Sequence, residues 1–296
     1  MLIQTSITPE YLLLIGKVFS AFYILCSLLG ITGNTIMIVV TLRSKKLRGT
    51  CNILIAIEAC CHIIVQLIQF SLVIFSFTEK FILQSSCFKV TLISLAALDF
   101  SVIAIFFLAV DRFLATFLPT FHKTIKSGCY LVLACFLGLL YAGGFRVLAY
   151  FNLMDVPVLC ITPFGTIGYP VYVWFGTSAF VNFCVVVMYA LVRRRISNGS
   201  KLKDHINKSL LTHIIIYICG WFSTFMFCIF YIVTVQDPLL FQGLIISLGI
   251  QANVSMCSAV FVYYFRSSLY NEEIRRLFGF ESSLVNPSPL VTRSTL

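Results

Sequence analysis

Charged residues are scarce in this chain. Only 11% of its 296 residues are Asp, Glu, Lys or Arg, whereas 59% are hydrophobic, and the mean hydropathy is +0.99. A soluble domain of this size needs many more charges on its surface. The shortage therefore excludes an ordinary soluble protein and indicates a chain that lies in a membrane.

The chain also lacks the strict alternation of apolar and polar residues that marks the strands of a membrane barrel. Instead it contains runs that stay apolar for more than about 18 residues, and a helix needs roughly 20 such residues to cross a bilayer. Seven predicted spans cover residues 18–42, 52–77, 88–113, 128–151, 169–192, 209–234 and 239–264. We therefore expect an all-α membrane protein, a seven-transmembrane helix bundle.

The net charge of +10 does not indicate nucleic-acid binding, because no basic stretch lies on a soluble segment. The basic residues do indicate orientation, since they collect in cytoplasmic loops. With the N-terminus outside, 17 of the 21 basic residues face the cytoplasm. Lys17, Lys80, Lys89 and Arg146 remain on the outer side.

This orientation divides the chain into four expected segments. Residues 1–17 form a short extracellular N-terminus, 18–264 the transmembrane domain, 265–280 an amphipathic cytoplasmic helix and 281–296 a disordered cytoplasmic tail. No cleavable signal peptide is evident. Because the outer tail is too short to be a binding domain, we expect any ligand site among the helices or outer loops.

Ten of the twelve cysteines lie in or at the edges of the apolar runs, where they are expected to act as small hydrophobes. Cys87 begins the third run, and Cys160 lies in the loop before the fifth. Several further features are spaced along the chain: Gly33-Asn34, Asp111-Arg112-Phe113, Pro119, Gly220-Trp221, Tyr263, Arg266 and Tyr270.

Together these features resemble the rhodopsin-like G-protein-coupled receptors over essentially the whole chain. The stretch from Leu47 to Ala56 and the Asp111-Arg112-Phe113 motif are similar to the nematode serpentine chemoreceptors of the srsx class. The resemblance implies a seven-helix fold, a heterotrimeric G protein as partner, and a location in the plasma membrane with contact to membrane lipid.

The sequence departs from the wider receptor family at several positions. His62 stands where an aspartate commonly serves a sodium site, and Trp221 is followed by Phe222-Ser223 rather than by a proline. Ala259-Val260 replaces the Asn-Pro pair of the seventh span. These departures leave the Asp111-Arg112 pair in place, but they argue against the usual proline hinges.

The resemblance implies a disulfide between Cys87 and Cys160, and the oxidising outer side of the membrane permits one. Such a bridge would hold the long outer loop over the bundle. The alternative is two unrelated buried thiols.

For G-protein coupling the resemblance implies roles for Asp111, Arg112, Phe113 and Tyr263. We expect Asp111 to hold Arg112 in the resting state, because a charge at this depth is costly unless it is paired. The alternative is an interfacial arginine that only marks orientation. The acidic lock often found on the sixth helix is replaced by Lys203, with Asp204 beside it.

Glu58 and His62 lie four residues apart, on one face of the second helix. We expect a hydrogen-bonded pair that replaces the sodium site, joined by Ser101, in which protonation of His62 biases the active state. The alternative is a static polar contact that fixes helix packing.

The candidate ligand-binding residues are polar or aromatic: Ser94, Asp99, Thr177, Trp221, Phe225 and Asn253. The resemblance implies that Trp221 lies at the floor of the pocket. Ser94 stands where amine receptors carry an aspartate, so an amine ligand is not favoured. Asp99 alternatively hydrogen-bonds a neighbouring helix through Asn182 or Thr177. The seventh span lacks a lysine, which excludes covalent retinal.

We therefore predict a chemosensory receptor that binds a small molecule or peptide and promotes nucleotide exchange on a G protein. We expect no catalytic residues, no metal, no cofactor and no enzymatic activity. A membrane transporter or channel is the alternative, although no internal repeat or ring of charge supports it. An intramembrane hydrolase would need a catalytic set around His62, which the sequence does not offer.

Overall fold

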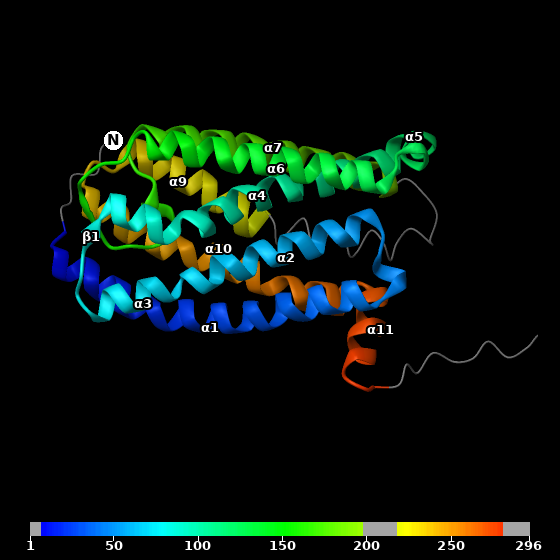
Figure 1. Cartoon of the computed structure of the whole chain (residues 1–296), viewed down its shortest axis with the longest axis horizontal. Coiled ribbons are helices and arrows are strands. Elements are labelled where there is room, and N and C mark those ends of the chain that lie inside the picture. Colours follow the sequence, from blue (N-terminus) through cyan, green and yellow to red (C-terminus); the bar gives the residue numbers. More distant parts are fainter. Residues whose placement is uncertain (1–6, 198–217, 281–296) are drawn as a thin grey trace, which may run out of the picture.

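The computed structural model describes residues 7–197 and 218–280, and this part of the chain forms a bundle of long helices (Figure 1). Six helical segments are long and apolar enough to cross a membrane: Pro9–Arg43, Thr50–Phe77, Gln84–Phe117, Ser127–Tyr150, Tyr169–Arg195 and Pro238–Arg266. A shorter apolar helix spans Gly220–Thr234. It belongs to the predicted sixth span, whose first residues, 209–217, lie outside the described ranges. The all-α, seven-helix architecture is confirmed.

Helix α1 (Pro9–Arg43) begins earlier than residue 18, where the first span was predicted to start. The Thr8 side chain accepts a hydrogen bond from the Tyr11 backbone N–H at 3.3 Å, and Pro9 occupies the first helical position. A capping threonine followed by proline favours a helix start, so the helix includes most of the predicted N-terminal tail.

The second span is divided into α2 (Thr50–Ile68) and α3 (Phe70–Phe77) by a turn at Gln69. After the short strand β1 (Ile82–Leu83), α4 (Gln84–Phe117) runs through the centre of the bundle and packs against α2, α6 and α7. Helices α5 (Pro119–Thr124), α6 (Ser127–Tyr150) and α7 (Tyr169–Ser197) follow. Strand β1 and helix α5 lie at opposite ends of the bundle (Figure 1).

The last part of the bundle contains a π-helical turn, η4 (Ile218–Phe222), which leads into α9 (Ser223–Thr234). Helix α10 (Pro238–Arg266) then packs along α1. Helix α11 (Ser268–Leu277) turns away from the bundle axis (Figure 1). Its buried residues Tyr270, Glu273 and Ile274 share one face, and Arg275 and Arg276 follow in its last turn.

A loop of residues 151–168, here called the 151–168 loop, joins α6 to α7. It carries strand β2 (Pro157–Val158), which pairs antiparallel with β1, and a 3-10 turn η2 (Thr162–Gly165). A second 3-10 turn, η1 (Lys45–Leu47), lies between α1 and α2 at the other end.

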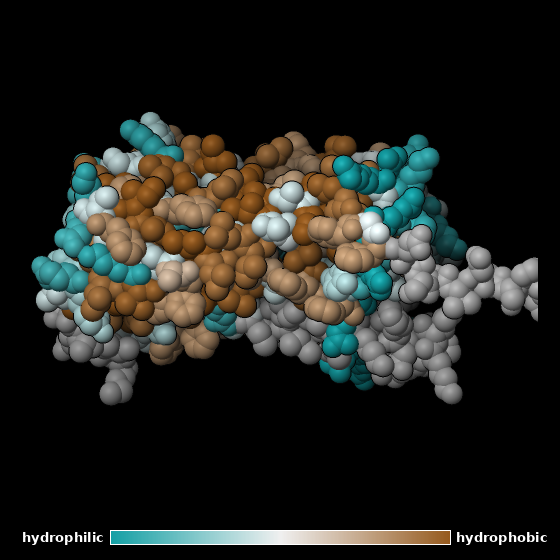
Figure 2. Space-filling model, turned by 90° about the horizontal axis from the view of Figure 1, so that it is seen from below, coloured by the Kyte–Doolittle hydropathy of each residue, from teal (hydrophilic) through white to brown (hydrophobic). Residues whose placement is uncertain are grey.

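The surface matches a bilayer. Figure 2 shows hydrophobic side chains over the middle of one face and hydrophilic side chains gathered towards both ends. Large exposed hydrophobic residues such as Ile93, Val132 and Phe180 contribute to this surface. Since water would not tolerate so much apolar surface, the hydrocarbon interior of a membrane is its natural environment.

Candidate functional site

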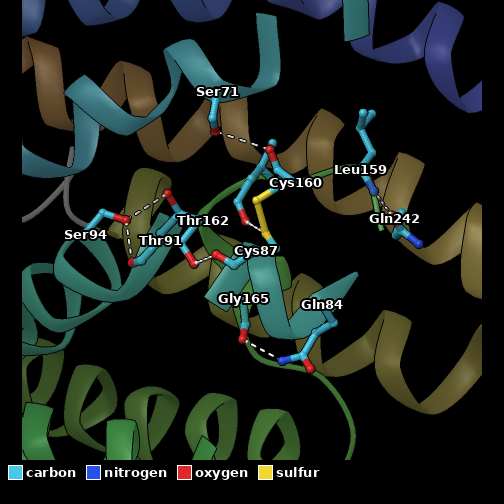
Figure 3. The surroundings of a disulfide bond; sticks show 11 residues. Ser71, Gln84, Cys87, Thr91, Ser94, Leu159, Cys160, Thr162, Gly165 and Gln242 are labelled. Atoms are coloured by element: carbon cyan, nitrogen blue, oxygen red, sulfur yellow. Dashed lines mark hydrogen bonds between the residues drawn. A yellow bond between two sulfur atoms is a disulfide. The ribbon is translucent and has the colours of Figure 1, made fainter. Parts of the chain in front are cut away.

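The 151–168 loop is fastened to the bundle at several points (Figure 3). The predicted disulfide between Cys87 and Cys160 is present, with both residues fully buried, and it joins the first turn of α4 to the loop. Two further bonds hold the neighbouring backbone. The Ser71 hydroxyl of α3 donates to the Cys160 carbonyl at 3.2 Å, and the Leu159 N–H donates to Gln242 Oε1 of α10 at 3.0 Å.

Gln84 adds a fourth attachment. Its Nε2 donates to the Gly165 carbonyl at 2.7 Å, and its Oε1 accepts from the Met154 N–H at 2.8 Å. The loop is thereby bonded to helices from both halves of the chain. We expect the 151–168 loop to keep its position over the bundle, because its backbone groups form hydrogen bonds with residues of the bundle.

A cavity lies beneath this loop, between α1, α2, α4, α7, α9 and α10. The volume of this cavity is about 70 Å³. Residues Ile161, Thr162 and Pro163 of the loop form one wall. Three of the predicted ligand-binding residues, Trp221, Phe225 and Asn253, line the cavity as well.

Aromatic rings form much of the opposite wall. Trp174 and Phe175 of α7 meet Phe225 of α9 with ring centroids 6.3 and 5.9 Å apart, and Trp221 stacks on Phe225 at 6.0 Å. Edge-to-face and offset ring pairs at these separations are mutually attractive. The sequence analysis included Trp221 and Phe225 but missed Trp174.

Asp99 does not line this cavity, although it was predicted to contact a ligand. Its carboxylate is fully buried and accepts from Arg146 Nη2 at 2.7 Å and from Trp174 Nε1 at 2.5 Å. Arg146 was predicted to face the outer side, and the alternative partners of Asp99 were Asn182 and Thr177. The ion pair replaces all of these, because a carboxylate so far from water is best compensated by an opposite charge.

Ser94 and Thr177 also lie outside the set of residues that line the cavity. The Ser94 hydroxyl donates to the Thr91 carbonyl at 2.9 Å and lies 3.4 Å from the Thr162 hydroxyl of the loop. Thr177 donates to the Val173 carbonyl of its own helix at 2.8 Å. In this structure the Ser94 hydroxyl lies between α4 and the loop, and the Thr177 hydroxyl bonds to its own helix, α7.

The predicted hydrogen-bonded pair of Glu58 and His62 is not formed. The nearest approach, His62 Nε2 to Glu58 Oε1, is 3.8 Å, and neither ring nitrogen has a hydrogen-bond partner among the described residues. The His62 ring instead lies against Trp221, with centroids 6.3 Å apart. Ser101 donates to the Leu98 carbonyl of its own helix at 2.8 Å. Side chains four residues apart on a helix can bond, but a separation of 3.8 Å is too long for a hydrogen bond, and the His62 ring packs against Trp221 instead.

At the opposite end of the bundle, Asp111 and Arg112 form the expected pair. Arg112 donates from Nε and Nη2 to Asp111 Oδ2 at 3.0 and 2.5 Å. The Asp111 side chain is 4% exposed, whereas that of Arg112 is 40% exposed. The acid is therefore held inside while the arginine reaches the surface.

His122 is a functional candidate that the sequence analysis missed. Its Nε2 lies 3.0 Å from Asp111 Oδ1, so both oxygens of this carboxylate have partners. Helix α5 positions the ring, since Pro119 starts this short helix directly after α4. No regular spacing in the sequence relates His122 to Asp111, because a helix break separates them.

Phe113 and Tyr263 occupy the same end of the bundle. Phe113 stacks on Phe117 with ring centroids 4.6 Å apart, and Tyr263 of α10 lies 5.0 Å from the ring of Tyr270 in α11. Lys203 stands where other receptors carry the acidic residue of the sixth-helix lock, and Asp204 follows it. Both lie outside the described residues.

The seven-helix bundle thus has a covered cavity at one end and an Asp-Arg pair at the other. A model of one protein family, described as serpentine type 7TM GPCR chemoreceptor Srsx, matches residues 27–278. The chain belongs to this family. A search of curated proteins finds no match.

Membership of the Srsx family confirms the resemblance and the receptor class that the sequence predicted. The protein is a multi-pass membrane chemoreceptor of a non-enzymatic family, with a disulfide between Cys87 and Cys160. Within the described ranges, no group of three or more His, Cys, Asp or Glu residues is placed to hold a metal ion.

Proposed function

We propose that this Srsx receptor binds a ligand in the cavity beneath the 151–168 loop and promotes nucleotide exchange on a heterotrimeric G protein at the Arg112 end. The single observation that carries the proposal is the position of Trp221. It lines the cavity, stacks on Phe225 and faces His62 on the other side. A ligand that displaces Trp221 would therefore disturb the packing between α2 and the η4 turn.

The η4 turn gives this disturbance a mechanical consequence. Trp221 lies within the π-helical turn, and the hydroxyls of Ser223 and Thr224 both donate to the Gly220 carbonyl, at 3.2 and 2.7 Å. A π-helical turn interrupts the regular hydrogen-bond ladder and is often found at functional positions. We infer that it supplies the bend for which other receptors use a proline after the tryptophan.

At the other end, we propose that activation separates Arg112 from Asp111 and presents the guanidinium to the G protein, with Phe113 and Tyr263 framing the same surface. The half-exposed Arg112 side chain supports this role, because only a modest movement would free it. The ligand then acts by favouring the arrangement in which the pair is open.

The charge distribution supports a plasma-membrane location with the N-terminus outside. Arg43, Lys45, Lys46 and Arg276 gather at the Arg112 end, around a surface pocket between α1 and α11. Basic residues at one membrane face favour the cytoplasmic side and anionic lipid. The disulfide at the opposite end then faces the oxidising exterior.

Nucleotide exchange on a G protein in membranes that hold the wild type or Arg112→Ala tests the proposal. A pool of small molecules and peptides serves as stimulus. We expect exchange in the wild type and a loss of at least tenfold in Arg112→Ala. Lys123→Ala, which changes an exposed basic residue on the adjacent α5, is the matched control and should retain exchange. Full exchange by Arg112→Ala would contradict the assigned role.

A further inference from the structure

The cavity beneath the 151–168 loop has an unusual chemical lining. None of the described residues that line it carries a charge, and most are aliphatic or aromatic. A charged ligand would lose its hydration there without an ionic partner, at a large cost in free energy. Asp99 and Arg146 do not offset this cost, because they are paired with each other behind Trp174.

The size of the cavity sets a second limit. The cavity volume of about 70 Å³ is about half of the roughly 150 Å³ of an engineered apolar cavity that holds benzene. A ligand that enters the cavity without moving its walls is therefore smaller than benzene. A peptide side chain would fit, but a peptide backbone would not pass the fastened loop without moving it.

Three polar groups of the lining already donate hydrogen bonds within the protein. Tyr23 donates its hydroxyl to the Ile246 carbonyl at 2.8 Å, Trp174 donates to Asp99, and Thr224 donates to Gly220. Their donors are therefore not offered to a ligand. The lining consequently presents little polarity, apart from two amides, those of Gln69 and Asn253.

Of the two amides, that of Asn253 has a defined orientation and an unpaired acceptor. Its Nδ2 donates to the Gly249 carbonyl at 2.7 Å, which fixes the amide orientation, since only the NH₂ group can donate to a carbonyl. Asn253 is 2% exposed, and its Oδ1 has no hydrogen-bond partner among the described residues. A buried acceptor of this kind costs stability unless something donates to it.

We propose that this cavity takes a small, uncharged, mostly apolar molecule, smaller than benzene, that donates one hydrogen bond to Asn253 Oδ1. A short aliphatic alcohol has this chemistry. The inference rests on the proposed function, because it takes the cavity as the ligand site, and it deepens that function by naming the class of ligand.

The chain provides its own reporter. It contains two tryptophans, Trp174 and Trp221, and both line the cavity. Tryptophan fluorescence of the purified receptor in lipid nanodiscs therefore reports on this site. A bromine atom quenches the fluorescence when a brominated probe enters. The probes are 3-bromopropan-1-ol, its methyl ether, 3-bromopropanoate and 3-bromopropylamine, of which only the first is both uncharged and able to donate.

We expect saturable quenching by the alcohol, about tenfold weaker binding of the ether, and no saturable quenching by the two charged probes. In Asn253→Leu the alcohol should lose its tenfold advantage while the ether still binds, which also shows that the variant is folded. Ala252→Phe, and as a second filling variant Cys228→Leu, should reduce the saturable quenching by both neutral probes. Saturable quenching that persists undiminished in both filling variants would place the probe outside this cavity and overturn the inference.

Several results would overturn the inference: saturable binding of a charged probe, equal binding of alcohol and ether by the wild type, or no saturable quenching by either neutral probe. Nucleotide exchange measured on the same samples tests the proposed function separately. Alcohol binding without exchange would contradict coupling and support the ligand class. Exchange that responds only to peptides or ions would support coupling and overturn the ligand class.

Discussion

Arg146 of α6 and Asp99 of α4 form an ion pair of 2.7 Å in the interior of the bundle, where the two side chains are 8% and 0% exposed. Arg146 Nη1 also lies 3.4 Å from the Thr166 hydroxyl of the 151–168 loop, and Trp174 of α7 donates to the same carboxylate. One buried pair thus connects three helices and the loop beside the cavity.

Removing one partner of this pair should be strongly destabilising. Asp99→Asn leaves the guanidinium buried without a counter-charge, so we expect the free energy of unfolding to fall by about 3 to 5 kcal/mol. The double variant Asp99→Leu with Arg146→Met should recover much of this loss, because it removes both charges. Thermal unfolding in nanodiscs measures the difference. Equal stability of the single and double variants would show that the pair does not act as a unit.

The disulfide should stabilise the receptor mainly by restricting the unfolded chain. Cys87 and Cys160 are 73 residues apart, and closing a loop of that length contributes about 4 kcal/mol on the chain-entropy model. The double variant Cys87→Ser with Cys160→Ser should therefore unfold at a clearly lower temperature. Cys129→Ser changes an exposed free cysteine and should unfold like the wild type. A mass map of non-reduced protein that finds both thiols free would refute the bridge.

Gly33 marks a close approach of α1 to α10. A Cβ atom at this position would lie 2.5 Å from Cγ1 and 3.1 Å from Cβ of Val260. Because a β-branched side chain in a helix has few rotamers to escape into, Gly33→Ala should destabilise by about 1 to 3 kcal/mol. Gly143→Ala, at a helical glycine of α6 where a Cβ meets no atom within 4 Å, should be neutral or slightly stabilising. Similar melting temperatures for the two variants would contradict the tight packing.

The Asp111 carboxylate is predicted to restrain Arg112 before any ligand arrives. Asp111→Asn removes the charge but keeps the shape, so nucleotide exchange without ligand should rise several-fold. His122→Ala frees one oxygen of the same carboxylate and should produce a smaller rise. Lys123→Ala alters the neighbouring exposed residue and should leave basal exchange at the wild-type rate. Unchanged basal exchange in Asp111→Asn would show that the pair is not a restraint.

Much of the architecture was predictable, because it follows from local patterns. Long apolar runs determine helical spans whatever their neighbours, and the Asp111-Arg112-Phe113 motif with the Leu47–Ala56 stretch indicated the receptor family that the family match confirms. The limits of the runs were less predictable. Thr8 and Pro9 start α1 by capping, which a count of apolar residues does not register.

The candidate site was predicted only in part. Trp221, Phe225 and Asn253, which were predicted to bind a ligand, line the cavity, and their ligand contact stays a prediction. Asp99 and Arg146 were assigned separate roles, although the rule that makes a buried acid costly applies equally to an arginine in an apolar run. Applying that rule to Arg146 would have suggested a partner for Asp99.

The sequence by itself determined that this chain is a helical membrane receptor with an Asp-Arg pair at the end of its third span, because hydropathy and short motifs are local properties. Only the tertiary structure decided which side chains meet. The rotation of α6 turns Arg146 towards Asp99, the helix break at Pro119 brings His122 to Asp111, and the fastened 151–168 loop closes an uncharged cavity over Asn253. The two side-chain pairs join residues 47 and 11 positions apart, and the loop residues of the cavity wall lie 90 to 92 positions from Asn253. These contacts depend on how far each helix is rotated and how deeply it is set in the bundle.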